Sequence, residues 1–195
     1  MTYGYRLNIE DIYIKSADEH WTIAKQEMKE ISDEDPATSE TRTFRSPTSD
    51  KGISSSVQAI VGWAICFESF INSAWNLSIA NKMPSSNLNK ELMKKLSTIE
   101  KMKEILRQNN IALNDKSWIS DLTSLFQLRN RLVHFKDTIE YVGFSFAPEF
   151  AKDFEENKLN TYRKALNDAI VEVGNAVDLR TEFLHGTYEI QTYEE

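Results

Sequence analysis

An arginine and a histidine are separated by four residues in the segment Leu128 to Phe135, which reads Leu-Arg-Asn-Arg-Leu-Val-His-Phe. A guanidinium offers planar, charge-assisted donors to the non-bridging oxygens of a phosphate. An imidazole titrates near pH ~6.5 and can act as general base or general acid. Together these side chains can promote metal-free RNA cleavage, in which the RNA's own 2′-hydroxyl attacks the adjacent phosphate.

Arg129 and His134 lie in a segment whose apolar spacing predicts a helix over about 116–138. At about 100° per residue, one side of this helix is apolar and is expected to face the core. The apolar positions are Leu125, Leu128, Leu132, Phe135 and Ile139. Asn130 and His134 share the nearly opposite face with Gln127 and Asp137, and Arg129 lies on a flank. This placement disfavours a core histidine and leaves a plain solvated face as the alternative.

The segment resembles the Arg-x4-6-His signature of the HEPN superfamily, with Asn after the arginine and an aromatic residue after the histidine. The apolar segment that contains Glu68-Ser69-Phe70-Ile71-Asn72 is similar to the first core helix of many HEPN proteins. The resemblance covers about 53–185. It implies an all-α, four-helix up-and-down bundle, here with an extra N-terminal helix and a short irregular or hairpin insertion after the motif helix.

The resemblance implies a metal-independent endoribonuclease that uses no cofactor. Arg129 would stabilise the charge that develops on the phosphate, and His134 would act as acid or base. Asn130 would orient the imidazole or hold a phosphate oxygen. One histidine cannot easily be acid and base at once, and HEPN proteins usually dimerise with two motifs facing one cleft. We therefore expect a homodimer acting on RNA.

The resemblance also implies a biological setting, that of a toxin or an antiviral-defence effector. Its partner would be an antitoxin protein, often one that resembles a nucleotidyltransferase. Glu68 and Asn72 are expected either to support the site or to fix helix packing. Arg131 and Lys136 either contact RNA phosphates or are solvated charges.

The charge balance limits the kind of nucleic-acid surface that the chain can present. With 23 Lys and Arg against 30 Asp and Glu, the net charge is -7. This argues against a broad, non-specific basic surface but leaves room for a small local one. It favours the alternative of a non-catalytic HEPN-like module that binds RNA, a nucleotide or a protein. A third hypothesis is a helical scaffold in which the motif is accidental.

The remaining elements are predicted from periodicity and capping patterns. Helices are expected over about 17–31, 55–80 and 88–108. A last helical pattern resumes after Pro148 and runs to His185, either continuously or with a break near Asn157, and Gly186 is its C-terminal cap. Residues 1–15 are expected to form an arm or a short irregular element, 32–52 a loop and 139–148 an extended or hairpin segment. We expect a single domain over 1–195, with its core at about 53–186 and an extension and loop over 1–52.

Other features of the sequence point to an intracellular globular protein. The single cysteine, Cys66, lies among apolar residues and is expected to be a small core residue. The longest apolar run, 60–67, is short for a membrane span, and residues 1–10 do not resemble a secretory signal. A cytoplasmic location without membrane contact is therefore expected. The sequence contains neither a Gly-rich phosphate loop nor a Cys/His zinc spacing, so no metal site is predicted.

Overall fold

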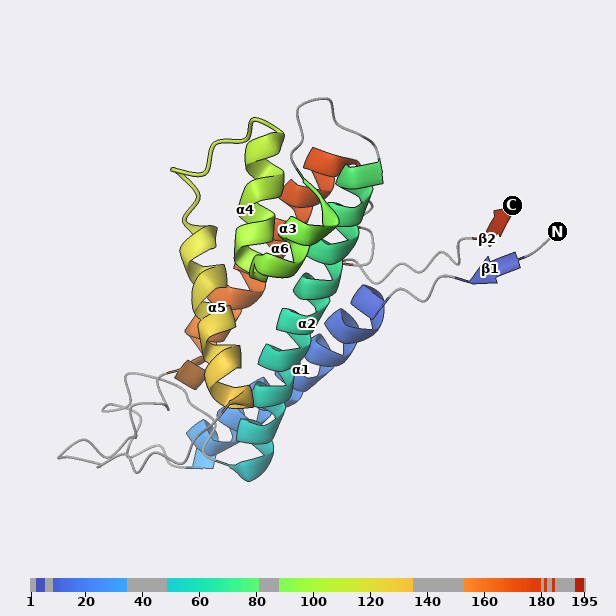
Figure 1. Cartoon of the computed structure of the whole chain (residues 1–195). Coiled ribbons are helices and arrows are strands. Elements are labelled where there is room, and N and C mark those ends of the chain that lie inside the picture. Colours follow the sequence, from blue (N-terminus) through green and yellow to red (C-terminus); the bar gives the residue numbers. More distant parts are fainter. Residues whose placement is uncertain are drawn as a thin grey trace. The chain divides into compact units, whose positions relative to one another are not determined.

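The computed structural model describes residues 3–5, 9–34, 49–80, 88–134, 153–179, 181, 184 and 192–194. The helices in these ranges are α1 (Ile9–Glu34), α2 (Asp50–Ala80), α3 (Lys90–Lys95), α4 (Thr98–Gln108), α5 (Trp118–Val133) and α6 (Glu156–Val177) (Figure 1). Two short strands, β1 (Tyr3–Tyr5) and β2 (Thr192–Glu194), pair antiparallel. The predicted all-α class is confirmed for the described residues apart from this ladder, whereas the HEPN-like arrangement of the helices stays a prediction.

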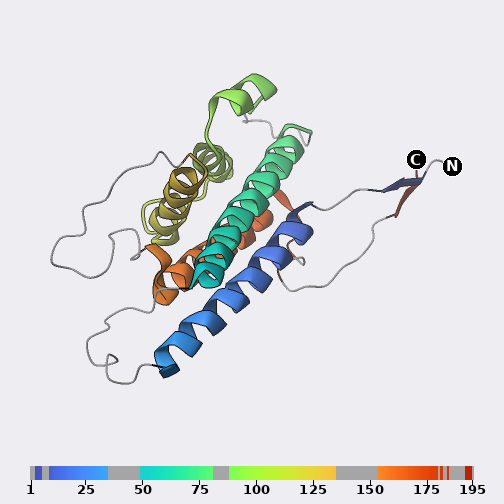
Figure 2. The same cartoon turned by 90° about the horizontal axis from the view of Figure 1, so that it is seen from below.

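Contacts along the chain group into two compact units. Unit 1 comprises Met1–Lys15, Ile65–Lys116 and Asn167–Glu195, and unit 2 comprises Ser16–Ala64 and Ser117–Leu166. Helices α1, α2 and α6 each contribute one part to each unit, and α1 and α2 are uninterrupted in Figure 2. The motif helix α5 belongs to unit 2. That the chain forms a single domain stays a prediction.

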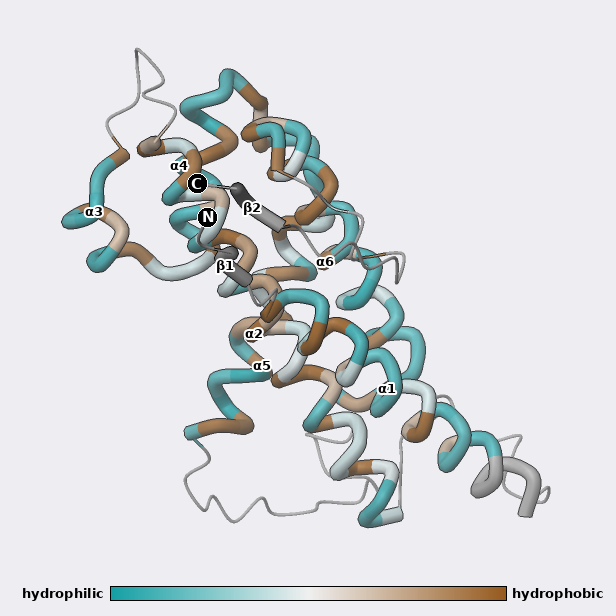
Figure 3. The backbone as a smooth tube through the Cα atoms, turned by 90° about the vertical axis from the view of Figure 1, so that its right-hand side faces the viewer, coloured by the Kyte–Doolittle hydropathy of each residue, from teal (hydrophilic) through white to brown (hydrophobic). Residues whose placement is uncertain are grey.

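The core of unit 2 comes from apolar side chains that recur at helical spacing, and Figure 3 shows hydrophobic and hydrophilic residues alternating along α1. The buried side chains include Trp21, Ala24 and Met28 of α1, Ile60 and Trp63 of α2, Leu122, Leu125 and Leu128 of α5, and Leu159, Tyr162 and Leu166 of α6. Trp21 and Trp63 meet edge to face, with 6.1 Å between ring centroids and 73° between planes. This arrangement is favoured for aromatic pairs.

A polar cluster around Asp18 links three helices within unit 2. One carboxylate oxygen of Asp18 (α1) accepts from Trp63 Nε1 (α2) at 2.8 Å and from Arg163 Nε (α6) at 2.8 Å. The other accepts from Arg163 Nη2 at 2.9 Å. The Trp63 ring is fully buried, so this carboxylate supplies the acceptor that the indole N–H needs away from water.

The core of unit 1 is built on the second half of α2. Its largest buried side chains are Phe67, Phe70, Ile71 and Trp75 of α2, Met102, Ile105 and Leu106 of α4, and Ile170 and Val173 of α6. Cys66 is 0% exposed, which confirms its prediction as a core residue.

Helix α1 begins at Ile9, so the prediction of an arm or a short irregular element was wrong for 9–15, and so was the predicted helix start near residue 17. Two buried residues extend the helix toward its N-terminus. Ile14 is 3% exposed, and the buried carboxylate of Glu10 accepts from Ser69 Oγ at 2.9 Å and from Ser73 Oγ at 3.1 Å. These partners lie about 60 positions away, which is why the local pattern did not predict the start.

Helix α2 begins at Asp50, earlier than the predicted helix start at about residue 55. Ser49 Oγ accepts from the backbone N–H of Gly52 at 2.9 Å and donates to Glu27 Oε2 at 2.9 Å, so Ser49 caps the helix. By length and composition α2 could cross a membrane, but 56% of its most apolar window is buried inside the protein. Core helices of soluble proteins behave in the same way, so the predicted cytoplasmic location stays a prediction.

The single helix predicted over about 88–108 is two helices, α3 and α4. Ser97 interrupts it, because its Oγ accepts from the Glu100 backbone N–H at 3.3 Å while Glu100 Oε2 accepts from the Ser97 backbone N–H at 2.8 Å. This reciprocal capping box starts a new helix. The hydrogen bonds from Ser97 also hold the pKa of Glu100 below its ordinary value.

The last two helices are shorter than predicted. Helix α5 ends at Val133, and the segments expected to continue it or to form the hairpin fall within 135–152, outside the described residues. Helix α6 ends at Val177 rather than near His185. Asp178 there adopts φ 55°, and Leu179 N–H donates to Gly174 O at 2.9 Å. This is a Schellman cap with aspartate in the left-handed position.

Candidate functional site

Helix α5 presents the motif by burying one side and exposing the other. Leu122, Leu125 and Leu128 are buried, which confirms the buried stripe as far as Leu128. Leu132 is half-buried, and Phe135 and Ile139 lie outside the described residues. The side chains of Asn130, Arg131 and His134 are exposed, and that of Arg129 is half-buried. The predicted site residues of α5 therefore lie at or near the solvent-facing side of the helix.

Arg129 and Asn130 are joined by a hydrogen bond. Arg129 Nη1 donates to Asn130 Oδ1 at 3.0 Å. Arg129 Nε is buried and has no hydrogen-bond partner among the described residues. Asn130 therefore holds the guanidinium through Nη1, and the charge-assisted donors that remain for a phosphate are N–H groups on the Nη atoms. Asn130 contacts the arginine, whereas its predicted action on the imidazole stays a prediction.

His134 is the C-terminal cap residue of α5. Its backbone N–H donates to Asn130 O at 3.0 Å, so the helical register continues up to the histidine. Its side chain is exposed, and within the described part of the chain it makes no hydrogen bond. An imidazole in this position is accessible to a bound ligand or to water.

The supporting residues predicted from the sequence belong to the other unit. Glu68 and Asn72 belong to unit 1, whereas α5 belongs to unit 2. Asn72 Oδ1 accepts from Lys101 Nζ at 2.9 Å, and Glu68 is half-buried. Lys136 lies outside the described residues. The supporting role of Glu68 and Asn72 and the RNA contact of Lys136 stay predictions.

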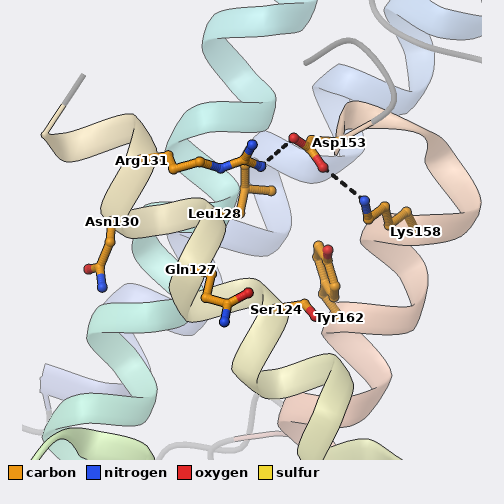
Figure 4. Close-up of a pocket in the computed structure, with 8 residues that line it drawn as sticks. All are labelled: Ser124, Gln127, Leu128, Asn130, Arg131, Asp153, Lys158 and Tyr162. Carbon is orange, nitrogen blue, oxygen red and sulfur yellow. Dashed lines mark hydrogen bonds and ion pairs between the residues drawn. The ribbon is translucent and has the colours of Figure 1, made fainter. Parts of the chain in front are cut away.

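A pocket of about 610 Å³ lies within unit 2, between α5 and the start of α6. Figure 4 shows its lining residues. Helix α5 supplies Ser124, Gln127, Leu128, Asn130 and Arg131. The turn before α6 supplies Asp153, and α6 itself supplies Lys158 and Tyr162. Two of the predicted site residues, Asn130 and Arg131, therefore line one pocket.

Two cations share one carboxylate in this pocket. Arg131 of α5 and Lys158 of α6 both reach toward Asp153 (Figure 4). Arg131 Nη2 donates to Asp153 Oδ2, and Lys158 Nζ donates to Asp153 Oδ1 at 2.8 Å. The Asp153 side chain is only 14% exposed, whereas those of Arg131 and Lys158 are 62% and 40% exposed. The anion is therefore the inner member of the cluster, and the cations face solvent.

The cluster fixes the charge states of its members. Burial acts to lower the pKa of the Lys158 ammonium, but the hydrogen bond to Asp153 and the nearby Tyr162 outweigh it, and the pKa lies above its ordinary value. Burial raises the pKa of the Tyr162 hydroxyl, against the opposing influence of Lys158. At neutral pH Lys158 is therefore charged and Tyr162 is neutral.

The sequence did not identify Asp153, Lys158 or Tyr162. No local pattern marks them, because they join Arg131 only through the packing of α6 against α5, 22 positions away in the case of Asp153. Among the described residues, no group of three or more His, Cys, Asp or Glu side chains is placed to hold a metal ion. The polar groups of the pocket are cationic, amide and hydroxyl groups and the single carboxylate of Asp153.

The chain was compared with models of known families, with curated proteins and with solved structures, and no significant match was found. The resemblance of the Arg129–His134 segment to the HEPN superfamily therefore stays a prediction.

Proposed function

We propose that the protein is a metal-independent endoribonuclease of the HEPN type. The observation that carries this proposal is the arrangement on α5. Arg129 is hydrogen-bonded to Asn130, and the exposed His134 follows one turn later on a helix anchored by buried leucines. Asn130 thus lies between a cationic donor, to which it is hydrogen-bonded, and an exposed imidazole one turn further along the same helix.

These residues suit cleavage by the RNA's own 2′-hydroxyl. A base takes the proton of that hydroxyl, its oxygen forms a bond to phosphorus, and the bond from phosphorus to the 5′-oxygen breaks. An acid then protonates the leaving 5′-oxygen. His134 serves as base or acid, and the Nη donors of Arg129 stabilise the charge on the non-bridging oxygens.

We further propose that two copies of the chain form the complete site. Base and acid are needed in the same turnover, and a second His134 supplies the second proton-transfer group. In a homodimer the exposed faces of two α5 helices would meet antiparallel around one cleft. The proposed setting is that of a toxin or antiviral-defence effector, restrained by an antitoxin that resembles a nucleotidyltransferase.

The test is cleavage of single-stranded RNA in the presence of EDTA. We expect the wild-type chain to cut RNA there and to leave a 2′,3′-cyclic phosphate and a 5′-hydroxyl. An oligonucleotide with a single 2′-deoxy sugar at the cut position should remain intact there, because the attacking hydroxyl is missing. Product ends are identified by mass spectrometry. Cleavage of the deoxy-substituted bond, or activity that EDTA abolishes, would contradict the mechanism.

The net charge of -7 favours one rival function. In this alternative the chain is a non-catalytic HEPN-like module that binds RNA, a nucleotide or a protein. RNA binding without any cleavage, unchanged by alanine at Arg129 and His134, would favour this module over the enzyme.

A further inference from the structure

We propose that the pocket between α5 and α6 holds one nucleotide of single-stranded RNA, next to the phosphodiester that is cleaved. This inference rests on the proposed ribonuclease function and gives it a source of sequence preference. In this proposal Arg131 and Lys158 bind the phosphate of the nucleotide, and Gln127 reads its base.

The helical register places the pocket beside His134. Gln127, Asn130 and Arg131 precede His134 by seven, four and three positions, and residues at these spacings share one face of an α-helix. All three line the pocket. The hydrogen bond from His134 N–H to Asn130 O keeps this register to the end of the helix. His134 does not itself line the pocket, so in this proposal the nucleotide lies in the pocket and its phosphodiester extends toward the imidazole.

The charge of the cluster matches a phosphodiester. Two cations, Arg131 and Lys158, share the single negative charge of Asp153, which leaves a local charge of +1. Asp153 is the least exposed of the three, so its carboxylate holds the two cations from the inner side of the cluster, and both cations face solvent. A phosphodiester carries one negative charge and offers two non-bridging oxygens to such donors.

The rest of the pocket suits a base. Leu128 and Tyr162 are buried and supply apolar surface, whereas Gln127 is exposed on α5. A glutamine amide has both a donor and an acceptor, so it can pair with the edge of a base. Single-stranded RNA is recognised through such edges when its bases are unstacked. The volume of about 610 Å³ lies within the range for small-ligand sites.

Two substitutions test the two halves of the pocket. Lys158→Gln should weaken the binding of every single-stranded RNA to a similar degree and reduce the salt dependence of binding by about one phosphate contact. Gln127→Ala should instead change the relative cleavage rates of oligonucleotides that differ only in the base beside the cut, by about tenfold. The matched controls are Lys164→Gln on the exposed side of α6 and Gln58→Ala on α2, both outside the pocket.

Binding and cleavage are measured separately, so that the two proposals can fail separately. Binding is followed by fluorescence anisotropy of labelled oligoribonucleotides with four different bases at one position, using chains that also carry His134→Ala. Cleavage is followed with His134 intact. Wild-type cleavage with both pocket variants equal to their controls would overturn the pocket and spare the ribonuclease. Pocket-dependent binding without any cleavage would overturn the ribonuclease and retain the pocket as a nucleotide site.

Discussion

Replacing His134 with alanine is expected to lower the rate of RNA cleavage by about 10²–10⁴-fold, the usual contribution of general acid–base catalysis. The same change should leave the free energy of unfolding within about 0.5 kcal/mol of wild type. The reason is that the imidazole is exposed and makes no hydrogen bond to the described residues. The measurements are single-turnover cleavage in EDTA and denaturant unfolding of the same preparations.

The arginine of the motif provides the companion variants. Arg129→Lys keeps the charge but loses the planar arrangement of donors, so it should not retain the full rate of RNA cleavage. Arg129→Ala should lower that rate by about 10²–10³-fold.

Mixing the Arg129→Ala chain with the His134→Ala chain should recover part of the cleavage activity if two chains share one cleft. His20→Ala on α1 is the matched histidine control. Wild-type cleavage rates in His134→Ala would remove the catalytic role of the motif.

Replacing Asp18 with alanine is expected to reduce the free energy of unfolding by about 1–2 kcal/mol, because the Asp18 side chain is 42% exposed and water screens its ion pair with Arg163. The substitution removes the acceptor for the buried Trp63 indole and both acceptors for the Arg163 guanidinium at once. An indole N–H left without a partner in a buried site keeps its full desolvation cost. The effect is measured as a lower urea midpoint with an unchanged slope.

Two further variants separate the components of this effect. Asp18→Asn keeps an acceptor for Trp63 but loses the ionic partner of Arg163, so it should fall between wild type and alanine. Glu19→Ala removes the neighbouring, exposed carboxylate of α1 and should stay within about 0.5 kcal/mol of wild type. If Asp18→Ala proves as stable as Glu19→Ala, the Asp18 cluster does not stabilise unit 2.

Features with a helical period were predictable from the sequence, and features that depend on distant partners were not. The buried stripe through Leu125 and Leu128 followed from periodicity, and the end of α2 at Ala80 followed from periodicity together with the helix-breaking sequence near Pro84. The start of α1 depends on Glu10 meeting serines of α2, and no local pattern shows that contact.

The candidate site shows the same division. Arg129, Asn130 and His134 were identifiable by residue type and spacing within one helix. The partner of Arg131 is Asp153, which precedes α6 and becomes visible only once that helix packs beside α5. The capping box at Ser97 is a different case. Its Ser-x-x-Glu spacing is visible in the sequence, and it divides the single helix predicted over about 88–108 into two.

The four tryptophans are divided unequally between the two units, which allows their fluorescence to report on each unit. Trp75 is the only one of the four in unit 1, where its Nε1 donates to Asn89 O at 3.2 Å. The others, Trp21, Trp63 and Trp118, belong to unit 2. Intrinsic fluorescence can therefore be assigned by unit. A chain that retains only Trp75 would report the melting of unit 1 by itself, and comparison with the full emission would reveal whether the two units unfold in one cooperative step.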